Sequence, residues 1–416
     1  MSRILIAVIG SRGDIAPLTG LGARLQQAGH DVVLASYAEF GDLVRGCGLP
    51  FRELHPARVD ERSSKVNPVA GLRDFFLPRG QWAIGDNMIA ALRDEPADVL
   101  LLSPLAELAG HPLAEAKGVP SIGVRLQPLS ATAAYPPAVL GSWTAGRLLN
   151  RAASGLGAAA IDTLYGRVVA GFRRQLGLPD ASASTLRRRR TDTDWPILYG
   201  YSPSVLPRPI DWRSGIGVTG YWWPFRPTQW QPPAELEAFL DDGPPPVFVG
   251  FGSVMKGASA SAHLSDVVQK ALRSVGARGV IQTGWAGLEA SGSDMLTVGD
   301  VPHDWLFERV AAVVHHCGAG TAAAGLRAGV PAVGVPVAGD QPFWARRLRE
   351  LGVSSATIPQ RRLTADRLGS AIRTALEDTT IHLATTTLAA SIAAEDGAGQ
   401  AVGVVEGCLR RGRRPT

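Results

Sequence analysis

Short apolar runs and amphipathic stretches alternate along the first half of the chain. Leu18, Leu21 and Leu25 recur with helical spacing, and Gly29 follows them at the expected helix end. This alternation predicts a parallel sheet whose strands are joined by crossover helices. The runs that we interpret as strands are residues 3–10, 31–36, 97–103, 120–126 and 196–207.

A second series with the same alternation begins after a stretch rich in proline and tryptophan, which lacks periodicity and which we interpret as a linker. Its apolar runs are residues 244–253, 277–285, 294–300, 311–321 and 331–337.

We therefore predict an α/β protein with two doubly wound, Rossmann-like domains. An Ala/Gly-rich helical region at 128–195 covers the first sheet in this prediction. The predicted parts are a first domain at 1–216, the linker at 217–235, a second domain at 236–395, and a final helix with a basic tail at 396–416.

The composition fits a protein with large cores. The chain has 416 residues, of which 45% are apolar and 19% charged, so it is long enough for two domains. No apolar stretch reaches the roughly 18 residues that a membrane span needs. The first residues lack the cleavage site of a signal peptide, and we expect a cytoplasmic protein. Cys47, Cys317 and Cys408 are too widely separated to suggest a metal site or a disulfide framework.

Charge gives little indication of a macromolecular partner. The formal net charge is +5, and basic residues concentrate at 186–190 and 409–416. Either stretch could contact nucleic acid or anionic lipid. Because no aromatic residues are interleaved with them, we interpret them as a solvated loop and a solvated tail and expect no nucleic-acid partner. A weak contact of the tail with a membrane stays an alternative.

The glycine-rich exits of predicted strands are the places where chemistry is expected, because ligands of open α/β sheets bind at the carboxyl ends of the strands. Gly318 and Gly320 allow close approach to a ligand, Thr321 adds a hydroxyl, and His316 adds a ring nitrogen. A helix beginning near Thr321 would suit a diphosphate. The alternative is a glycine turn in which Thr321 is the N-cap and His316 simply ends the strand. The loop is neither a Walker A motif nor G-x-G-x-x-G.

The first exit, GSRGD at 10–14, carries an acid where a phosphate-binding loop would not. This argues against a dinucleotide dehydrogenase. Asp14 is a candidate base, and its alternative is a helix N-cap with Pro17 in the first turn. Arg12 is either a surface residue or an ion-pair partner.

The segment VPHDWLFERVAAVVHHCGAGTAAAGLRAGVPAVGVPVAGDQPFWARRLRELGV at 301–353 resembles the nucleotide-sugar signature of the GT-B glycosyltransferases of the UDP-glycosyltransferase superfamily. More narrowly, it is similar to the sterol glucosyltransferases and the bacterial enzymes that glycosylate glycopeptides, macrolides and other natural products. Residues 10–36 resemble the start of the same group. The resemblance covers nearly the whole chain and is weakest at 55–95 and 128–195, and it implies two domains facing each other across a cleft.

The resemblance also implies roles for individual residues. Asp14 would be the general base for the acceptor hydroxyl in an inverting transfer. For Asp340 a helix N-cap, and for His303 a plain helix start, stay as alternatives. The implied donor contacts are Ser11, Ser253, His316, Gly318, Gly320 and Thr321 for the diphosphate, Val301, Pro302 and His303 for the nucleotide base, and Asp340 and Gln341 for the sugar.

Two positions depart from the plant branch of the superfamily. That branch has a ribose-binding glutamate where this chain has Ala324, and a histidine base where this chain has Asp14. The ribose contact must therefore come from elsewhere.

The acceptor implied by the resemblance is an apolar molecule with several rings, such as a sterol, and the donor is UDP-glucose. No cofactor is expected, and no metal, because no pair of carboxylates has the spacing of a metal site. Five aromatic residues could line the acceptor pocket, although we expect about two of them to touch ligand and the rest to be core: Phe75, Phe76, Trp82, Tyr135 and Trp143.

Other functions stay open at this point. The chain could use a dTDP-deoxysugar in an antibiotic pathway, it could be an epimerase or hydrolase of the nucleotide sugar, or it could be a non-catalytic partner of another glycosyltransferase. The fold alone does not decide among them, and the oligomeric state is not readable from the sequence.

Overall fold

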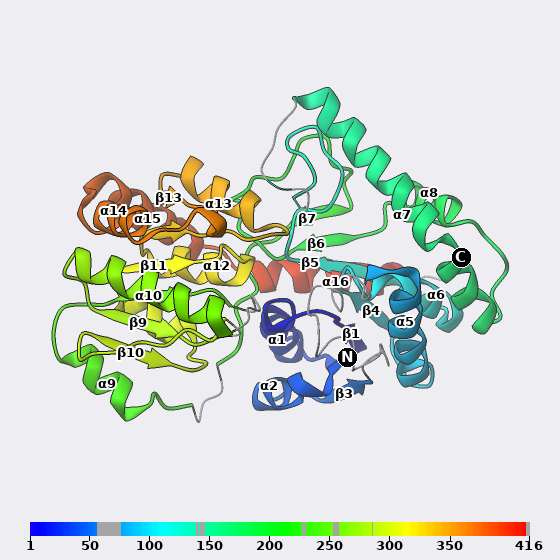
Figure 1. Ribbon diagram of the computed structural model, residues 1–416. Coiled ribbons are helices and arrows are strands. Elements are labelled where there is room, and N and C mark those ends of the chain that lie inside the picture. Colours follow the sequence, from blue (N-terminus) through cyan, green and yellow to red (C-terminus); the bar gives the residue numbers. More distant parts are fainter. Residues whose placement is uncertain are drawn as a thin grey trace.

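The computed structural model describes residues 1–55, 76–138, 141, 146–226, 230–252, 258–284 and 286–412. Within these residues, all strands belong to two separate parallel sheets that lie side by side (Figure 1). The predicted class, α/β with two doubly wound Rossmann-like domains, is confirmed.

The first sheet has the strand order β3-β2-β1-β4-β5-β6-β7 in the described part of the chain. Its strands are β1 (Arg3–Ala7), β2 (Asp31–Tyr37), β3 (Phe51–Leu54), β4 (Val99–Leu102), β5 (Ser121–Arg125), β6 (Ile197–Tyr199) and β7 (Ile216–Val218). The helices of this half are α1 (Arg12–Gln27), α2 (Gly41–Gly46), α5 (Pro78–Leu92), α6 (Glu107–Lys117), α7 (Arg147–Gln175) and α8 (Ala183–Asp192).

The second sheet has the order β10-β9-β8-β11-β12-β13 among the described residues. Its strands are β8 (Val247–Gly250), β9 (Gly279–Gln282), β10 (Met295–Val298), β11 (Ala312–His315), β12 (Ala332–Gly334) and β13 (Ser354–Thr357). The helices are α9 (Ala234–Asp241), α10 (Ala258–Ser274), α11 (His303–Leu306), α12 (Ala319–Ala328), α13 (Gln341–Glu350), α14 (Ala365–Glu377), α15 (Thr379–Ala393) and α16 (Gly397–Gly412).

The central strands are apolar throughout because helices cover both faces of each sheet. In the first sheet β1 lies between β2 and β4, and Ile6 is in register with Leu34 and Leu101. All three side chains are fully buried. In each sheet the strand order reverses beside the first strand, at β1/β4 and at β8/β11, and crevices for ligands form at such points.

The final helix returns to the first domain. Ala401 and Val405 of α16 are fully buried in the same apolar cluster as Leu21 and Leu25 of α1. Figure 1 shows α16, in red, next to α1. The chain therefore crosses between the domains twice, once through the linker and once before α16.

The predicted linker begins within the first sheet, because its first two residues, 217 and 218, belong to β7. Trp222, which lies inside the predicted linker, is 1% exposed and packs in the core of the first domain. The next segment contacts α1, since a Cβ on Gly20 would overlap the carbonyl oxygen of Trp223.

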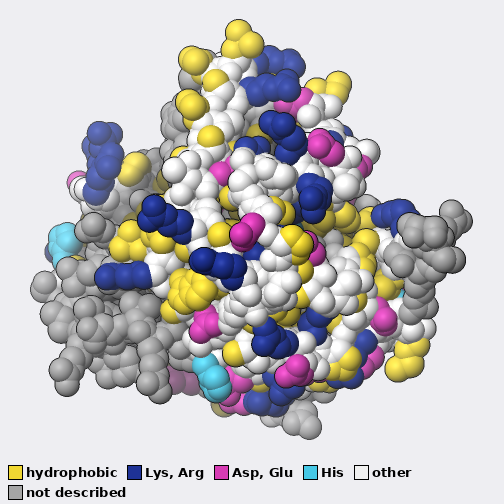
Figure 2. Space-filling model, turned by 90° about the vertical axis from the view of Figure 1, so that its right-hand side faces the viewer, with side chains coloured by type: hydrophobic (Ala, Val, Ile, Leu, Met, Phe, Trp, Pro, Cys, Tyr) yellow, Lys and Arg dark blue, Asp and Glu magenta, His cyan; other side chains and the backbone are white. Residues whose placement is uncertain are grey.

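The basic stretch at 186–190 is not a loop, as predicted, but part of helix α8. Arg187 forms an ion pair of 2.8 Å with Asp162 of α7, and burial lowers the pKa of Arg190. Figure 2 shows the Lys and Arg side chains of this side of the molecule scattered among acidic and uncharged ones. In the described residues, no helix has both the length and the apolar character to span a membrane.

We expect Gly20→Ala to destabilise the protein by about 1–3 kcal/mol, because the added methyl group overlaps backbone that has no room to move. The measurement is the midpoint of thermal unfolding. Gly166→Ala in α7 is the matched control, because a Cβ there meets nothing within 4 Å. The control should gain up to about 1 kcal/mol from helix propensity. Equal midpoints for the two variants would contradict the contact between linker and helix.

Candidate functional site

The site is formed where strand ends of the two domains meet. The loop after β1 leads into α1, and α1 packs against α12 of the second domain (Figure 1). Nη1 of Arg12 lies 3.1 Å from Oδ2 of Asp300 across the domain boundary. Both side chains are more than half exposed, so this ion pair adds little stability. It does place the start of α1 directly beside the loop after β10.

Asp14 lies in the first turn of α1 with its carboxylate folded back over the helix start. Its Oδ2 accepts hydrogen bonds from the backbone N of Ser11 at 2.8 Å and from Oγ of Ser11 at 3.0 Å. A Cβ at Gly10 would overlap this carboxylate, so only glycine fits there. The N-cap is Ser11, and Asp14 is the third residue of the helix; the alternative of Asp14 as N-cap is therefore wrong.

The other oxygen of Asp14 faces a residue that sequence reasoning missed. Nε2 of Gln127 donates to Oδ1 of Asp14 at 3.3 Å. Gln127 is half-buried and lies two residues beyond the end of β5. Its position as a polar residue at a strand exit was the available signal.

His316 lies between two glycine turns. A Cβ on Gly252 would lie 2.7 Å from its Cε1, and a Cβ on Gly318 would overlap its Nε2. Burial lowers the pKa of His316 to about 4. The ring is therefore neutral at pH 7 and donates through one nitrogen only.

Helix α12 begins three residues after His316. Gly318 is its N-cap, so the helix starts at Ala319, before the predicted Thr321, and Thr321 is not the N-cap. The backbone N–H groups of the first turn, which includes Gly320 and Thr321, have no partners within the helix. This turn is a positive helix end with free donors, which suits an anion.

The chain between His315 and α12 is held in an unusual conformation. Cys317 has a φ of 65°, in the left-handed region, and its N–H donates to Nδ1 of His315 at 3.1 Å. Burial lowers the pKa of His315 to about 3. The neutral, buried ring of His315 therefore fixes the turn that sets the direction of α12.

The predicted base-binding segment lies after β10. Val301 is buried, Pro302 is the N-cap of α11, and His303 is its first residue. The ring of His303 stacks on Phe307 with centroids 4.5 Å apart, and burial, Arg12 and His316 lower its pKa to about 4. One face of the His303 ring is therefore covered by Phe307.

Asp340 and Gln341 lie at the start of α13. Asp340 occupies the N-cap position, which was the alternative to a sugar-binding role. Its carboxylate makes no hydrogen bond to the helix backbone and instead accepts from Nε1 of Trp344 at 3.0 Å. Burial raises the pKa of Asp340, and the charge of Asp14 raises it further. Oε1 of Gln341 accepts from the backbone N of Val337 at 2.8 Å, which leaves its NH₂ group for a ligand.

The three predicted acceptor residues that the structure describes do not share one cluster. Trp82 stacks on Phe172 of α7 at 4.9 Å, and the carbonyl oxygen of the half-exposed Phe76 accepts from the hydroxyl of Tyr165. Tyr135 is buried against Phe343 of the second domain, with ring centroids 5.4 Å apart. Three further predicted site residues lie outside the described part of the chain: Phe75, Trp143 and Ser253.

Two hollows are defined by the described residues. One of 210 Å³ lies beside Tyr135 and Phe343, below the range of about 300–1,000 Å³ that is usual for ligand pockets. The other, of 620 Å³, lies between α7 and the start of α8 and contains no residue of the predicted site. Among the residues described, no group of three or more His, Cys, Asp or Glu could hold a metal ion.

Comparisons with known proteins match this architecture. The family described as "Erythromycin biosynthesis protein CIII-like, C-terminal domain" matches residues 285–406, and "Glycosyltransferase family 28 N-terminal domain" matches residues 4–77. The O-mycaminosyltylonolide 6-deoxyallosyltransferase of Streptomyces fradiae is 34% identical over 97% of this chain and 97% of its own length.

Sterol glucosyltransferases are similar as well. Two sterol 3-beta-glucosyltransferases of Arabidopsis thaliana, UGT80B1 and UGT80A2, are 32% and 30% identical over 96% of this chain. The chain spans 67% and 64% of their lengths.

Solved structures share the fold at lower identity. The structure of the glycotransferase of kitacinnamycin has a TM-score of 0.74 at 20% identity and covers 98% of this chain and 99% of that chain. The glycosyltransferase VinC in complex with dTDP has a TM-score of 0.68 at 19% identity, covering 98% and 100%. The chain thus belongs to the GT-B glycosyltransferases, in the group that contains the sterol glucosyltransferases and the bacterial natural-product enzymes, and it is a glycosyltransferase of natural products or sterols.

Proposed function

We propose that the protein transfers glucose from UDP-glucose to a hydroxyl of an apolar acceptor with several rings, such as a sterol, with inversion at the anomeric carbon. The observation that carries this proposal is the contact of the start of α1, which holds Asp14, with the loop after β10 of the second domain, through Arg12 and Asp300. A base on one side and a sugar-binding carboxylate on the other leave the reacting atoms between them.

Asp14 is the general base in this proposal. Its Oδ1 takes the proton of the acceptor hydroxyl while the hydroxyl oxygen forms a bond to C1 of the sugar. The bond between C1 and the diphosphate oxygen breaks on the opposite face, and its electron pair leaves with the nucleoside diphosphate. A carboxylate is a sufficient base because the hydroxyl becomes acidic as the new bond forms.

The leaving group is held by neutral donors and a helix end. The first-turn amides of α12 and the N–H of His316 stabilise the charge that grows on the diphosphate. Thr321 adds a hydroxyl group, and Ser253 keeps its predicted role. Ser11, from the opposite domain, already donates its hydroxyl proton to Asp14, so its predicted contact with the diphosphate would replace that bond. Neither a cofactor nor a metal has a part in this proposal, so EDTA should leave the rate unchanged.

The rest of the donor follows the same edge of the second sheet. The backbone of Val301–His303 contacts the nucleotide base, because the ring of His303 is occupied by stacking. Asp340 accepts from sugar hydroxyls, and the NH₂ group of Gln341 donates to them.

The choice of substrates rests on the relatives. The name sterol 3-beta-glucosyltransferase supports glucose and a sterol. A second candidate is transfer of a dTDP-deoxysugar to an antibiotic acceptor. It is supported by the 6-deoxyallosyltransferase, which matches along nearly its whole length, and by the neighbour solved with dTDP.

A matrix of donors and acceptors separates these candidates. UDP-glucose and dTDP-glucose are each incubated with cholesterol and with the macrolide aglycone tylactone, and products are detected by mass. Glucosylated cholesterol from UDP-glucose supports the proposal, and product from dTDP-glucose and tylactone alone supports the second candidate. Free sugar or an epimer formed equally well without acceptor would favour a hydrolase or epimerase.

We expect Asp14→Asn to lower the rate of transfer to an alcohol by about 10²–10⁴-fold, because the amide cannot take a proton. With 4-nitrophenol, which is largely ionised at pH 8, the loss should be far smaller, because no proton has to be removed. Initial rates with cholesterol and with 4-nitrophenol measure the two losses. Equal losses would assign Asp14 a structural role, and full activity with cholesterol would remove it from the mechanism.

We expect His316→Ala to weaken binding of the nucleotide sugar roughly tenfold, as for a lost hydrogen bond to a charged group. Because the pKa of His316 is about 4, its ring carries no charge between pH 5 and 8. The affinity of the wild-type protein for UDP-glucose should therefore be constant over this range by calorimetry. A tightening as the pH falls through 6.5 would mean that a protonated histidine binds the diphosphate.

A further inference from the structure

We propose that Gln127 is a positioning residue that holds the carboxylate of Asp14 in the orientation needed to accept a proton. The inference deepens the proposed function and rests on it. The two carboxylate oxygens of Asp14 have different partners. Oδ2 is engaged by Ser11 of its own helix, through two hydrogen bonds, and Oδ1 is contacted by Gln127 from another strand.

One hydrogen bond to Oδ1 leaves it able to accept a second. A carboxylate has about four lone-pair sites, and two donors on Oδ2 and one on Oδ1 use three of them. The fourth site, on Oδ1, is the position for the acceptor hydroxyl. Gln127 prevents rotation of the carboxylate about its Cβ–Cγ bond. Without this contact, Oδ1 would lose its alignment with the acceptor hydroxyl.

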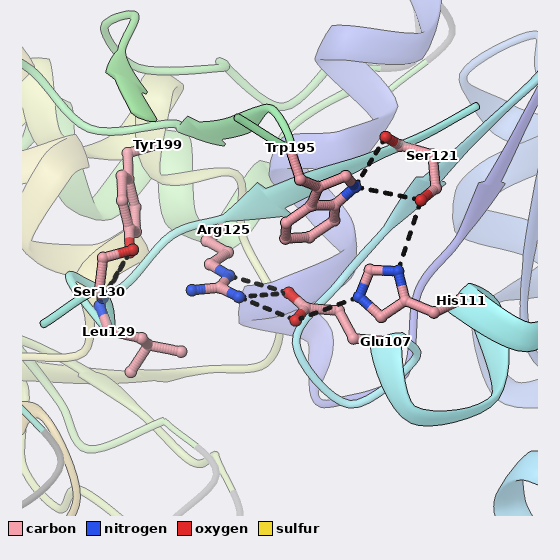
Figure 3. Close-up of polar contacts among 8 residues, drawn as sticks. All are labelled: Glu107, His111, Ser121, Arg125, Leu129, Ser130, Trp195 and Tyr199. Atoms are coloured by element: carbon pink, nitrogen blue, oxygen red, sulfur yellow. Dashed lines mark hydrogen bonds and ion pairs between the residues drawn. The ribbon is translucent and has the colours of Figure 1, made fainter. Parts of the chain in front are cut away.

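The backbone that carries Gln127 is anchored just before it. The guanidinium of Arg125, the last residue of β5, donates from Nε and Nη2 to the two carboxylate oxygens of Glu107 at 2.9 and 2.8 Å. Both side chains are more than four-fifths buried, and Figure 3 shows the two planar groups facing each other. Burial alone would lower the pKa of Arg125, but Glu107 and Tyr199 more than compensate and raise it.

The same loop is anchored again just after Gln127. The hydroxyl oxygen of Tyr199 accepts from the backbone N of Leu129 at 3.2 Å and of Ser130 at 2.7 Å, and it donates to Oγ of Ser130 at 2.8 Å (Figure 3). Tyr199 is fully buried in β6. Helix α6, through Glu107, and strand β6, through Tyr199, thus fix both ends of the six-residue segment 125–130, and Gln127 lies near its middle. Such an anchored loop is what a positioning role requires.

The electrical neutrality of Gln127 also matters. Oδ1 of Asp14 is contacted by the uncharged amide of Gln127, and Arg12 on the same helix is engaged by Asp300. An arginine in place of Gln127 would weaken the base by an ion pair, and a second acid would compete for the same proton. The amide orients the carboxylate without either effect.

Gln127→Glu tests the contact independently of turnover. It places a second carboxylate beside Asp14, so protonation of Asp14 should shift to higher pH by roughly one unit. The carboxyl resonance of Asp14 is followed by NMR in protein labelled with ¹³C-carboxyl aspartate. This resonance is identified as the one missing from the spectrum of Asp14→Asn. The acidic limb of kcat/KM for UDP-glucose and cholesterol should move in the same direction.

Gln175→Glu is the matched control. Nε2 of Gln175 donates to Oδ1 of Asp86 at 2.7 Å, so the chain offers a second pair of amide and carboxylate, on the outer helices of the same domain. This variant makes the same change in net charge, and it should leave both the Asp14 resonance and the pH profile as in the wild type. An equal shift in both variants would overturn the inference.

Gln127→Ala tests the positioning role itself. Loss of a hydrogen bond to a charged group should lower kcat about 10–100-fold and leave KM for UDP-glucose within about twofold. Gln175→Ala should change neither constant. A wild-type kcat in Gln127→Ala would overturn the inference, and a loss confined to KM would assign Gln127 to binding. If Asp14→Asn keeps full activity, the proposed function fails instead, whatever the Gln127 variants do.

Discussion

The whole site depends on one constraint: the carboxyl ends of two parallel sheets must face one another. In each sheet the loops at these ends carry the polar residues, because parallel strands all deliver their exits to one edge. Two crossings of the chain keep the edges together. The linker presses against α1 at Gly20, and α16 completes the first core through Val405. These two attachments hold together the domain that carries Asp14 and the domain that carries Asp340.

The constraint also explains which parts of the fold were predictable. The central strands were found because burial on both faces requires continuous apolar runs, as in β1 and β4. Three strands were not predicted, β3, β7 and β13, and all three are sheet edges. Edge strands bury less, so β3 includes Arg52 and Glu53, and β13 includes Ser355 and Thr357. Their sequences carry little sign of a strand, because pairing with the neighbour decides their structure.

The site was predictable to the extent that its residues lie in glycine-rich exits. Asp14 and His316 were found because glycines mark close approach of the backbone. Gln127 was missed because the exit of β5 contains no glycine, and its partner is 113 positions away in the sequence. Trp82 illustrates why acceptor contacts are harder to predict. An aromatic residue that stacks on a neighbouring helix, here on Phe172, has the same sequence pattern as one that lines a pocket.

The electrostatics of the proposed donor side fit a reaction that must release a highly charged product. Three histidines near the start of α12 are buried or partly buried, and their pKa values are lowered to about 4 for His303, 3 for His315 and 4 for His316. All three rings are neutral at pH 7, and Arg12 is engaged by Asp300. A helix end contributes only about half a unit charge. The free nucleoside diphosphate is more negative than the same group in the nucleotide sugar, so a clamp of full positive charges would hold the product more tightly than the donor. Helix-end amides and neutral histidines stabilise the charge as it forms in the transition state. Because they carry no full positive charge, they still release the product, as turnover requires.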